Sequence, residues 1–139
     1  MKKTFLFIAI LFLSASTSMA QNVTAESITG EWLTAPKDAK ILIYKEGNKY
    51  SGKINWGKTI GRKDDKNPDV SIRHRELLGA VILKNFVFNG KDKWEDGTIY
   101  DPDNGKTYSC IIKLQDDKTL EVRGYIGFSV FGRTEIWTR

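Results

Sequence analysis

Residues 106–126, KTYSCIIKLQDDKTLEVRGYI, decide the fold of this chain because apolar and polar side chains alternate along them. Successive side chains of a β-strand point to opposite faces of the sheet, so positions two apart share a face. One face of the first half is apolar: Tyr108, Cys110, Ile112 and Leu114. In the second half Leu120 and Val122 alternate with charged residues, and the intervening Asp116-Asp117-Lys118 can reverse the chain. The stretch therefore predicts an antiparallel hairpin with one buried face and one face in water.

The same pattern extends over the rest of the chain and predicts an all-β fold. We expect eight strands, at Glu31–Thr34, Lys40–Lys45, Lys49–Trp56, Val81–Phe88, Lys93–Tyr100, Lys106–Leu114, Thr119–Ile126 and Arg133–Thr138. Most linkers are short and contain Gly, Asn or Asp, which suit hairpin turns. Sheet twist drives eight consecutive antiparallel strands to close, and closure removes exposed edges. The sequence predicts an eight-stranded antiparallel up-and-down β-barrel; a two-sheet sandwich, the alternative, would normally need longer crossovers.

One long connection separates the third and fourth predicted strands, from Gly57 to about Gly79. Its polar and charged residues include Asp64, Asp65, Asn67, Asp69, Arg73, His74, Arg75 and Glu76. A proline, Pro68, follows the asparagine and disfavours helix there. This composition predicts a mobile loop that is followed by a short helical turn.

The first twenty residues are typical of an export signal. Lys2 and Lys3 precede an apolar run from Phe5 to Leu13, and Ser18-Met19-Ala20 provides a cleavage site of small residues. The run is shorter than the roughly 20 residues that span a bilayer, so we predict no stable membrane anchor. The expected mature chain, residues 21–139, is one domain in the periplasm or outside the cell.

Charge and cysteine content restrict the function classes further. The formal net charge of +5 includes both lysines of the signal, and the remaining charges of both signs are dispersed. We therefore expect no nucleic-acid partner. Cys110 is the single cysteine, which excludes an intramolecular disulfide, and its apolar strand face predicts a buried, inert thiol.

The residue patterns of common catalytic and metal sites are weak or incomplete in this chain. His74 is the single histidine, which leaves little material for a zinc centre. Residues 101–105, DPDNG, resemble the start of a calcium loop, but Ile112 stands where a bidentate Glu belongs, so a hairpin turn is favoured. We predict no catalytic residue, metal or cofactor. An enzyme, as a third hypothesis, would have to use the following residues: Asp64, Asp65, Asp69, His74, Glu76 and Asp96.

Aromatic side chains are the best candidates for a ligand site, because a cavity for an apolar molecule needs large apolar walls. The candidate ligand-binding aromatics are Trp56, Tyr100, Tyr108, Tyr125, Phe128 and Phe131. Eight strands enclose an interior that side chains can fill or that holds one small ligand, so these aromatics could equally be core filler.

Two further features have more than one interpretation. Strict alternation points Arg123 outward, but a bulge at Gly124 would turn it inward to bind a carboxylate or phosphate head group. The apolar turn at 128–131, FSVF, could contact a membrane, a partner or a ligand, or pack under the long loop.

At several places the residues resemble known families. Gly30-Glu31-Trp32 is similar to the Gly-x-Trp signature of lipocalins, and this resemblance implies that Gly30 and Trp32 are structural and that Arg133 or Arg139 packs over the tryptophan to close the barrel. More specific motifs are 52–54 with Trp56, 67–69, 77–79, 99–110, 122–127 and 131–134. Together they resemble the exported bacterial domain-of-unknown-function family 2147, for which a lipocalin-like, calycin-type barrel is expected.

These observations favour an exported protein of the bacterial envelope that binds a small, partly apolar molecule such as a lipid. The alternative is a filled barrel that acts as an interaction or structural module, with a protein partner that the sequence does not identify.

Overall fold

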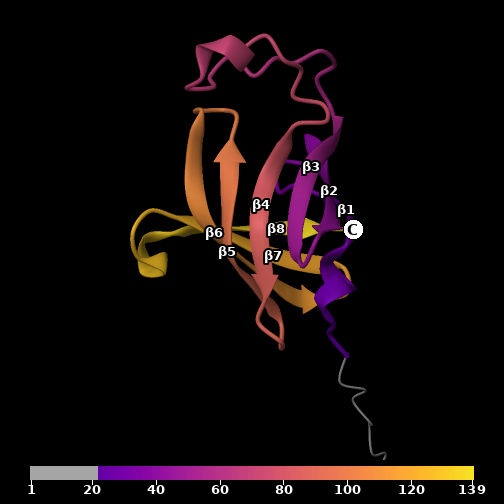
Figure 1. Ribbon diagram of the computed structural model, residues 1–139. Helices are drawn as coiled ribbons and strands as arrows, with labels where there is room; N and C mark the ends of the chain where they lie inside the picture. Colours follow the sequence, from indigo (N-terminus) through magenta and orange to yellow (C-terminus); the bar gives the residue numbers. More distant parts are fainter. Residues whose placement is uncertain (1–21) are drawn as a thin grey trace, which may run out of the picture.

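The computed structural model describes residues 22–139, which form a closed barrel of eight antiparallel strands in sequence order (Figure 1). The strands are β1 (Gly30–Leu33), β2 (Ala39–Glu46), β3 (Lys49–Gly57), β4 (Val81–Phe88), β5 (Lys93–Asp101), β6 (Lys106–Asp116), β7 (Thr119–Tyr125) and β8 (Arg133–Thr138). Three short 3-10 helices accompany them: η1 (Ala25–Ile28), η2 (Val70–Ile72) and η3 (Ser129–Phe131). The predicted up-and-down barrel is confirmed. The predicted signal, 1–20, lies outside the described residues.

The β6–β7 hairpin has the predicted alternation. Ile112 pairs with Val122 and Leu114 pairs with Leu120, and all four side chains are buried. Cys110, on the same face, is fully buried as predicted. The apolar face of residues 106–126 therefore forms part of the barrel core, where its burial is the main favourable contribution to folding.

The helix η1 closes the end of the barrel opposite the long loop (Figure 1). Two buried tryptophans bind its backbone: Trp32 Nε1 donates to the Ile28 carbonyl at 2.8 Å, and Trp94 Nε1 donates to the Ala25 carbonyl at 3.0 Å. Buried indole N–H groups need such partners, since leaving one unpaired is costly. These bonds fix the short helix under the core and make this the closed end.

The seam between the first and last strands is covered by Arg139. Its guanidinium lies 4.0 Å from the centre of the Trp32 ring and donates to the carbonyls of Thr29 and Ser27 at 2.9 and 3.1 Å. Arg133, the alternative, begins β8 at the other end, and its side chain is 87% exposed. The geometry therefore places Arg139, and not Arg133, over Trp32, because β8 runs toward the closed end.

Glycine allows close packing inside the barrel at Gly97. The Phe86 ring of the neighbouring strand lies where a Cβ of residue 97 would stand. The β5–β6 register shifts between Trp94 and Gly97, and Asp96 has a φ of 62°. The irregular strand and the missing side chain together give the Phe86 ring its space.

The long connection runs from the end of β3 to the start of β4 and arches over one end of the barrel, drawn in pink at the top of Figure 1. It contains η2 and a two-residue bridge between Lys63 and Glu76. The helical turn thus lies within the loop, N-terminal to the Arg73–Glu76 segment. Among residues 22–139, no helix is long and apolar enough to cross a membrane.

Candidate functional site

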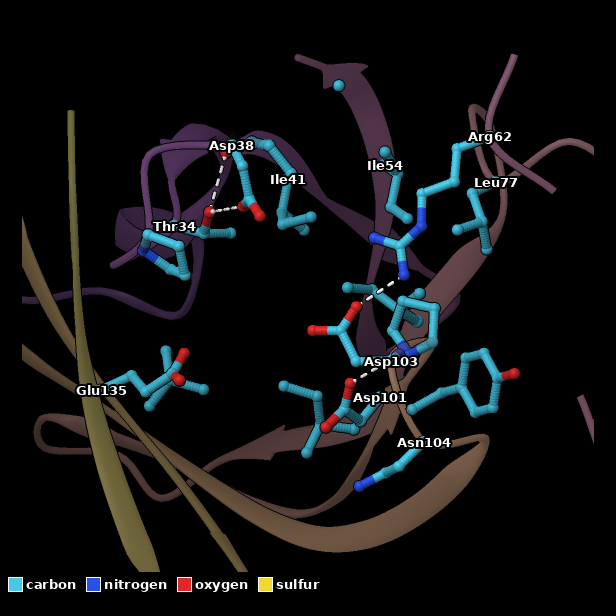
Figure 2. A pocket seen from close by; sticks show the side chains of 18 of the residues that line it. Thr34, Asp38, Ile41, Ile54, Arg62, Leu77, Asp101, Asp103, Asn104 and Glu135 are labelled. Carbon is cyan, nitrogen blue, oxygen red and sulfur yellow. Dashed lines mark hydrogen bonds and ion pairs between the residues drawn. The ribbon is translucent and has the colours of Figure 1, made fainter. Parts of the chain in front are cut away.

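A cavity of about 1050 Å³ opens at the loop-covered end of the barrel (Figure 2). Five strands contribute a branched aliphatic side chain each to its walls: Ile41, Ile54, Ile82, Ile99 and Val122. Pockets for small molecules are typically about 300–1,000 Å³, so this space is large enough for one. The fully buried Trp32 and Trp94 are absent from its described lining and bind η1 at the closed end. The barrel is filled at one end and hollow at the other.

The cavity brings together five of the seven residues that the sequence singled out for ligand binding. They are Trp56, Tyr100, Tyr108, Tyr125 and Phe131. Their positions differ, since Tyr100 on β5 and Tyr108 on β6 are half-buried, whereas Trp56 is 42% exposed and Phe131 is 76% exposed at the rim. Phe128 is 75% exposed and does not belong to the described lining.

Arg123 does not line the cavity, and the inward alternative for its side chain is wrong. The β6–β7 register passes through Arg123 and Gly124 without a bulge, so alternation keeps the side chain outside. Its Nε donates to the Ser129 carbonyl at 2.8 Å and its Nη1 to Thr134 Oγ1 at 2.7 Å. Arg123 holds the β7–β8 connection and provides no head-group contact inside the barrel.

The aliphatic walls and the polar groups of the mouth were not predicted from the sequence. The alternation of apolar and polar residues in the first five strands predicts that side chains such as those of Ile41 and Ile54 point inward. It does not distinguish a side chain in the packed core from one that lines a cavity. Five acidic residues line the mouth: Asp38, Glu76, Asp101, Asp103 and Glu135. Two arginines accompany them, Arg62 and Arg133. Figure 2 shows Asp101, Asp103 and Glu135 directed toward the open space.

Several of these mouth groups bind one another. Arg62 Nη2 lies 2.5 Å from Asp103 Oδ1, and Arg133 Nη2 lies 3.6 Å from Glu135 Oε1. Asp101 accepts the backbone N–H of Asp103 at 2.9 Å, and Thr34 Oγ1 donates to Asp38 at 3.2 Å. The acids outnumber the arginines, so the mouth is more favourable to neutral or cationic groups than to anions.

A buried carboxylate joins the long loop to the barrel beside the cavity. Asp64 has no exposed surface, and its carboxylate accepts hydrogen bonds from Tyr100 OH at 2.6 Å and from Asn67 Nδ2 at 2.8 Å. Arg75 adds a two-pronged contact through Nε at 2.9 Å and Nη2 at 2.8 Å. We call these four side chains the Asp64 cluster.

The Asp64 cluster changes the acidity of its members. Burial alone would raise the pKa of Asp64, but the hydrogen bonds from Tyr100, Asn67 and Arg75 outweigh it and lower the pKa below its usual value. Burial, helped by the Asp64 carboxylate, raises the pKa of Tyr100 to about 12. Tyr100 therefore stays a hydrogen-bond donor and Asp64 stays ionised at neutral pH.

The long loop also touches the β5–β6 turn directly. Gly105, at a φ of 72°, lies so close to the Lys66 backbone that a Cβ would overlap the Lys66 carbonyl. The Arg62–Asp103 ion pair joins the same two segments. The loop is thus fastened over the mouth by three contacts with residues 100–105.

Most of the residues that an enzyme would need lie outside the cavity lining. Of the six titratable candidates, Glu76 alone belongs to the cavity lining, and within residues 22–139 no group of three His, Cys, Asp or Glu side chains is placed to hold a metal. Cys110 is enclosed by the core, and burial raises the pKa of its thiol to about 12. Its placement agrees with a structural role.

Comparison with known proteins agrees with the fold. No curated protein matches the chain. Among solved structures, the chain is similar to HP1028 from Helicobacter pylori, described as a member of the lipocalin family, with 24% identity and a TM-score of 0.68 over 73% of this chain and 71% of that one. A model of the DUF2147 family, described as uncharacterized proteins conserved in bacteria, matches residues 30–139. The chain, with its lipocalin-like barrel, therefore belongs to the DUF2147 family.

Proposed function

We propose that this protein binds a small, partly apolar molecule in the cavity of its barrel and does so in the bacterial envelope. The observation that carries the proposal is the hollow end of the barrel, with about 1050 Å³ of space, aliphatic walls and a polar mouth. This combination suits a ligand whose apolar part is buried and whose polar end meets fixed charges. The signal-like residues 1–20 support the location.

The mouth also favours one class of polar end. Five carboxylates and two guanidinium groups line the opening, and the guanidinium group of Arg123 lies outside the cavity. An anionic head group would be repelled by the surplus of carboxylates, whereas a neutral or cationic head group would not. The proposed ligand is therefore an amphiphile with a neutral or cationic polar end, rather than a free fatty acid.

A first test is the intact native mass of the mature protein, purified from its own envelope and measured before and after organic extraction. A reproducible extra mass that extraction removes is the expected result. A bare protein mass that stays unchanged after incubation with envelope lipid extracts would contradict the proposal and favour the interaction module.

A second test fills the cavity. Ile99→Trp places a large ring in the wall, and Val87→Trp is the control because Val87 is partly exposed and lies outside the lining. With the neutral apolar dye N-phenyl-1-naphthylamine, we expect Ile99→Trp to weaken binding about tenfold or more and Val87→Trp to leave it unchanged. Equal dye binding by both variants and the native protein would place the dye elsewhere.

A further inference from the structure

The connection between β7 and β8 exposes an unusual amount of apolar surface for so short a segment. We call residues 126–132 the β7–β8 tip. It carries four exposed apolar side chains, Ile126, Phe128, Val130 and Phe131, each between 69% and 76% exposed, and no charged residue. In Figure 1 it stands away from the barrel wall, in yellow. Exposed apolar side chains gathered on one projection indicate a contact surface.

Part of the tip's backbone is already hydrogen-bonded. The Phe131 N–H donates to the Phe128 carbonyl at 3.0 Å, and the Gly132 N–H donates to the Ser129 carbonyl at 3.2 Å. Arg123 adds donors from outside the tip, to the carbonyls of Ser129 at 2.8 Å and Val130 at 3.4 Å. A segment can leave water for an apolar phase only when its backbone polar groups have partners. These bonds give partners to the N–H groups of Phe131 and Gly132 and to the carbonyls of residues 128–130.

The position of the tip relates it to the cavity. Ile126 and Phe131 belong to the cavity lining, so the tip is one side of the mouth. Ile60, on the long loop, lines the same cavity and is 97% exposed. Of the ten exposed large apolar side chains in the described chain, eight lie in the long loop, in the β7–β8 tip or next to the long loop at the end of β3. Apolar exposure is thus concentrated around the opening.

Basic residues accompany both apolar projections. Arg133 directly follows the tip; its side chain is 87% exposed, and its Nη2 lies 3.6 Å from Glu135 Oε1. Lys58, also exposed, lies two residues before Ile60. Apolar side chains with adjacent Lys or Arg suit a membrane surface, where the apolar groups enter the acyl boundary and the basic groups meet lipid phosphates. A stable protein interface typically buries about 800 Å² on each partner in a continuous patch, which a projecting turn of seven residues supplies poorly.

We propose that the β7–β8 tip inserts its apolar side chains into the surface of a phospholipid bilayer and brings the cavity mouth to that surface. The role of this docking rests on the proposed function: an apolar ligand could pass between the membrane and the barrel without crossing water. The docking itself does not require a ligand in the cavity. Arg123 holds the tip in the conformation seen in the structure, through its bonds to the carbonyls of Ser129 and Val130.

The test is sedimentation of the full mature protein with vesicles of phosphatidylcholine, with and without one third phosphatidylglycerol. The tip variant is Phe128→Ser with Val130→Ser, since both side chains are exposed and neither lines the cavity. The control is Val87→Ser with Ile136→Ser, which removes two exposed apolar side chains from β4 and β8, away from the mouth. Circular dichroism verifies that each variant is folded.

We expect the native protein and the control to bind the phosphatidylcholine vesicles, and the tip variant to bind them at least about tenfold more weakly. Phosphatidylglycerol should not strengthen this binding, because the five carboxylates of the mouth outnumber its two arginines. Equal vesicle binding by the tip variant and the control would overturn the proposal, as would a native protein that binds neither kind of vesicle.

The same variants separate docking from ligand binding. In solution, the tip variant should bind N-phenyl-1-naphthylamine as the native protein does. Loss of vesicle binding with dye binding retained supports docking through the tip. A native protein that binds vesicles through the tip but takes up no dye would refute the proposed function and leave the docking in place.

Discussion

The hydroxyl of Tyr100 lies 2.6 Å from a carboxylate oxygen of Asp64, a residue 36 positions earlier in the chain. Tyr100 is on β5 and lines the cavity, whereas Asp64 is fully buried within the long loop. Charge-assisted hydrogen bonds of this kind are about twice as strong as neutral ones. This contact therefore fastens the loop over the mouth and also fixes the position of the Tyr100 side chain in the cavity wall.

Tyr100→Phe should loosen the loop. The substitution keeps the ring and removes one donor from a buried carboxylate, which costs about 1–3 kcal/mol of unfolding free energy. Urea unfolding measures the loss, and hydrogen exchange at residues 62–67 should become faster. Tyr108→Phe is the matched control, because its hydroxyl accepts an exposed hydrogen bond from Asn104. A similar loss of unfolding free energy in both variants would show that the hydrogen bond to Asp64 contributes no more than the exposed one at Tyr108.

Stability should fall at low pH because of Asp64. Its pKa is lowered in the folded protein, so its stabilising effect is complete above the unfolded value of about 3.9 and is lost as the pH falls through the folded pKa. The unfolding free energy, measured by urea titration between pH 6 and pH 2, should decline below about pH 4. Asp64→Asn should be less stable at pH 6 and decline less steeply. An unchanged slope in that variant would assign the acid sensitivity to other carboxylates.

Arg139→Ala should destabilise the barrel by about 2 kcal/mol, because it removes the cation–π contact with Trp32 and bonds to three backbone carbonyls. The seam it covers is weak, since β1 pairs with β8 at Leu33 and Thr138 whereas four residue pairs join β1 to β2. Arg133→Ala should change stability by less than about 0.5 kcal/mol. Thermal unfolding of the two variants side by side decides between them.

The strands were predictable because their signal is local. In residues 106–126 each side chain's face follows from its neighbours two positions away, and Cys110, Ile112 and Leu120 are buried as that rule requires. The choice between Arg133 and Arg139 needed the direction of β8 relative to the closed end. Residues 133 and 139 are an even number of positions apart, so alternation places both on the same face. It does not say which end of the barrel each residue occupies.

The candidate site was predictable in its aromatics and not in its polar structure. Asp64 is the same residue type as the neighbouring Asp65, yet it is fully buried. Its partners Arg75 and Tyr100 lie 11 and 36 positions away in the sequence. No local pattern encodes those partners. Whether an inward side chain such as Ile41 packs against another or faces a cavity depends likewise on what the opposite wall provides. Sequence alternation gives the direction of a side chain and not the space in front of it.

The acidic mouth should be measurable as a preference among ligands of one chain length. We expect dodecylamine to displace N-phenyl-1-naphthylamine at about threefold to tenfold lower concentration than dodecanoate at low salt, and the difference to shrink at high salt. Asp38→Asn with Glu135→Gln, both in the cavity lining, should reduce the preference. Glu95→Gln with Glu121→Gln, outside that lining on β5 and β7, removes the same charge and should leave it intact. If both double variants reduce the preference equally, the overall charge of the protein is responsible. If dodecanoate binds more tightly to the native protein, the mouth contains an anion site that the placement of Arg62 and Arg133 would then have to explain.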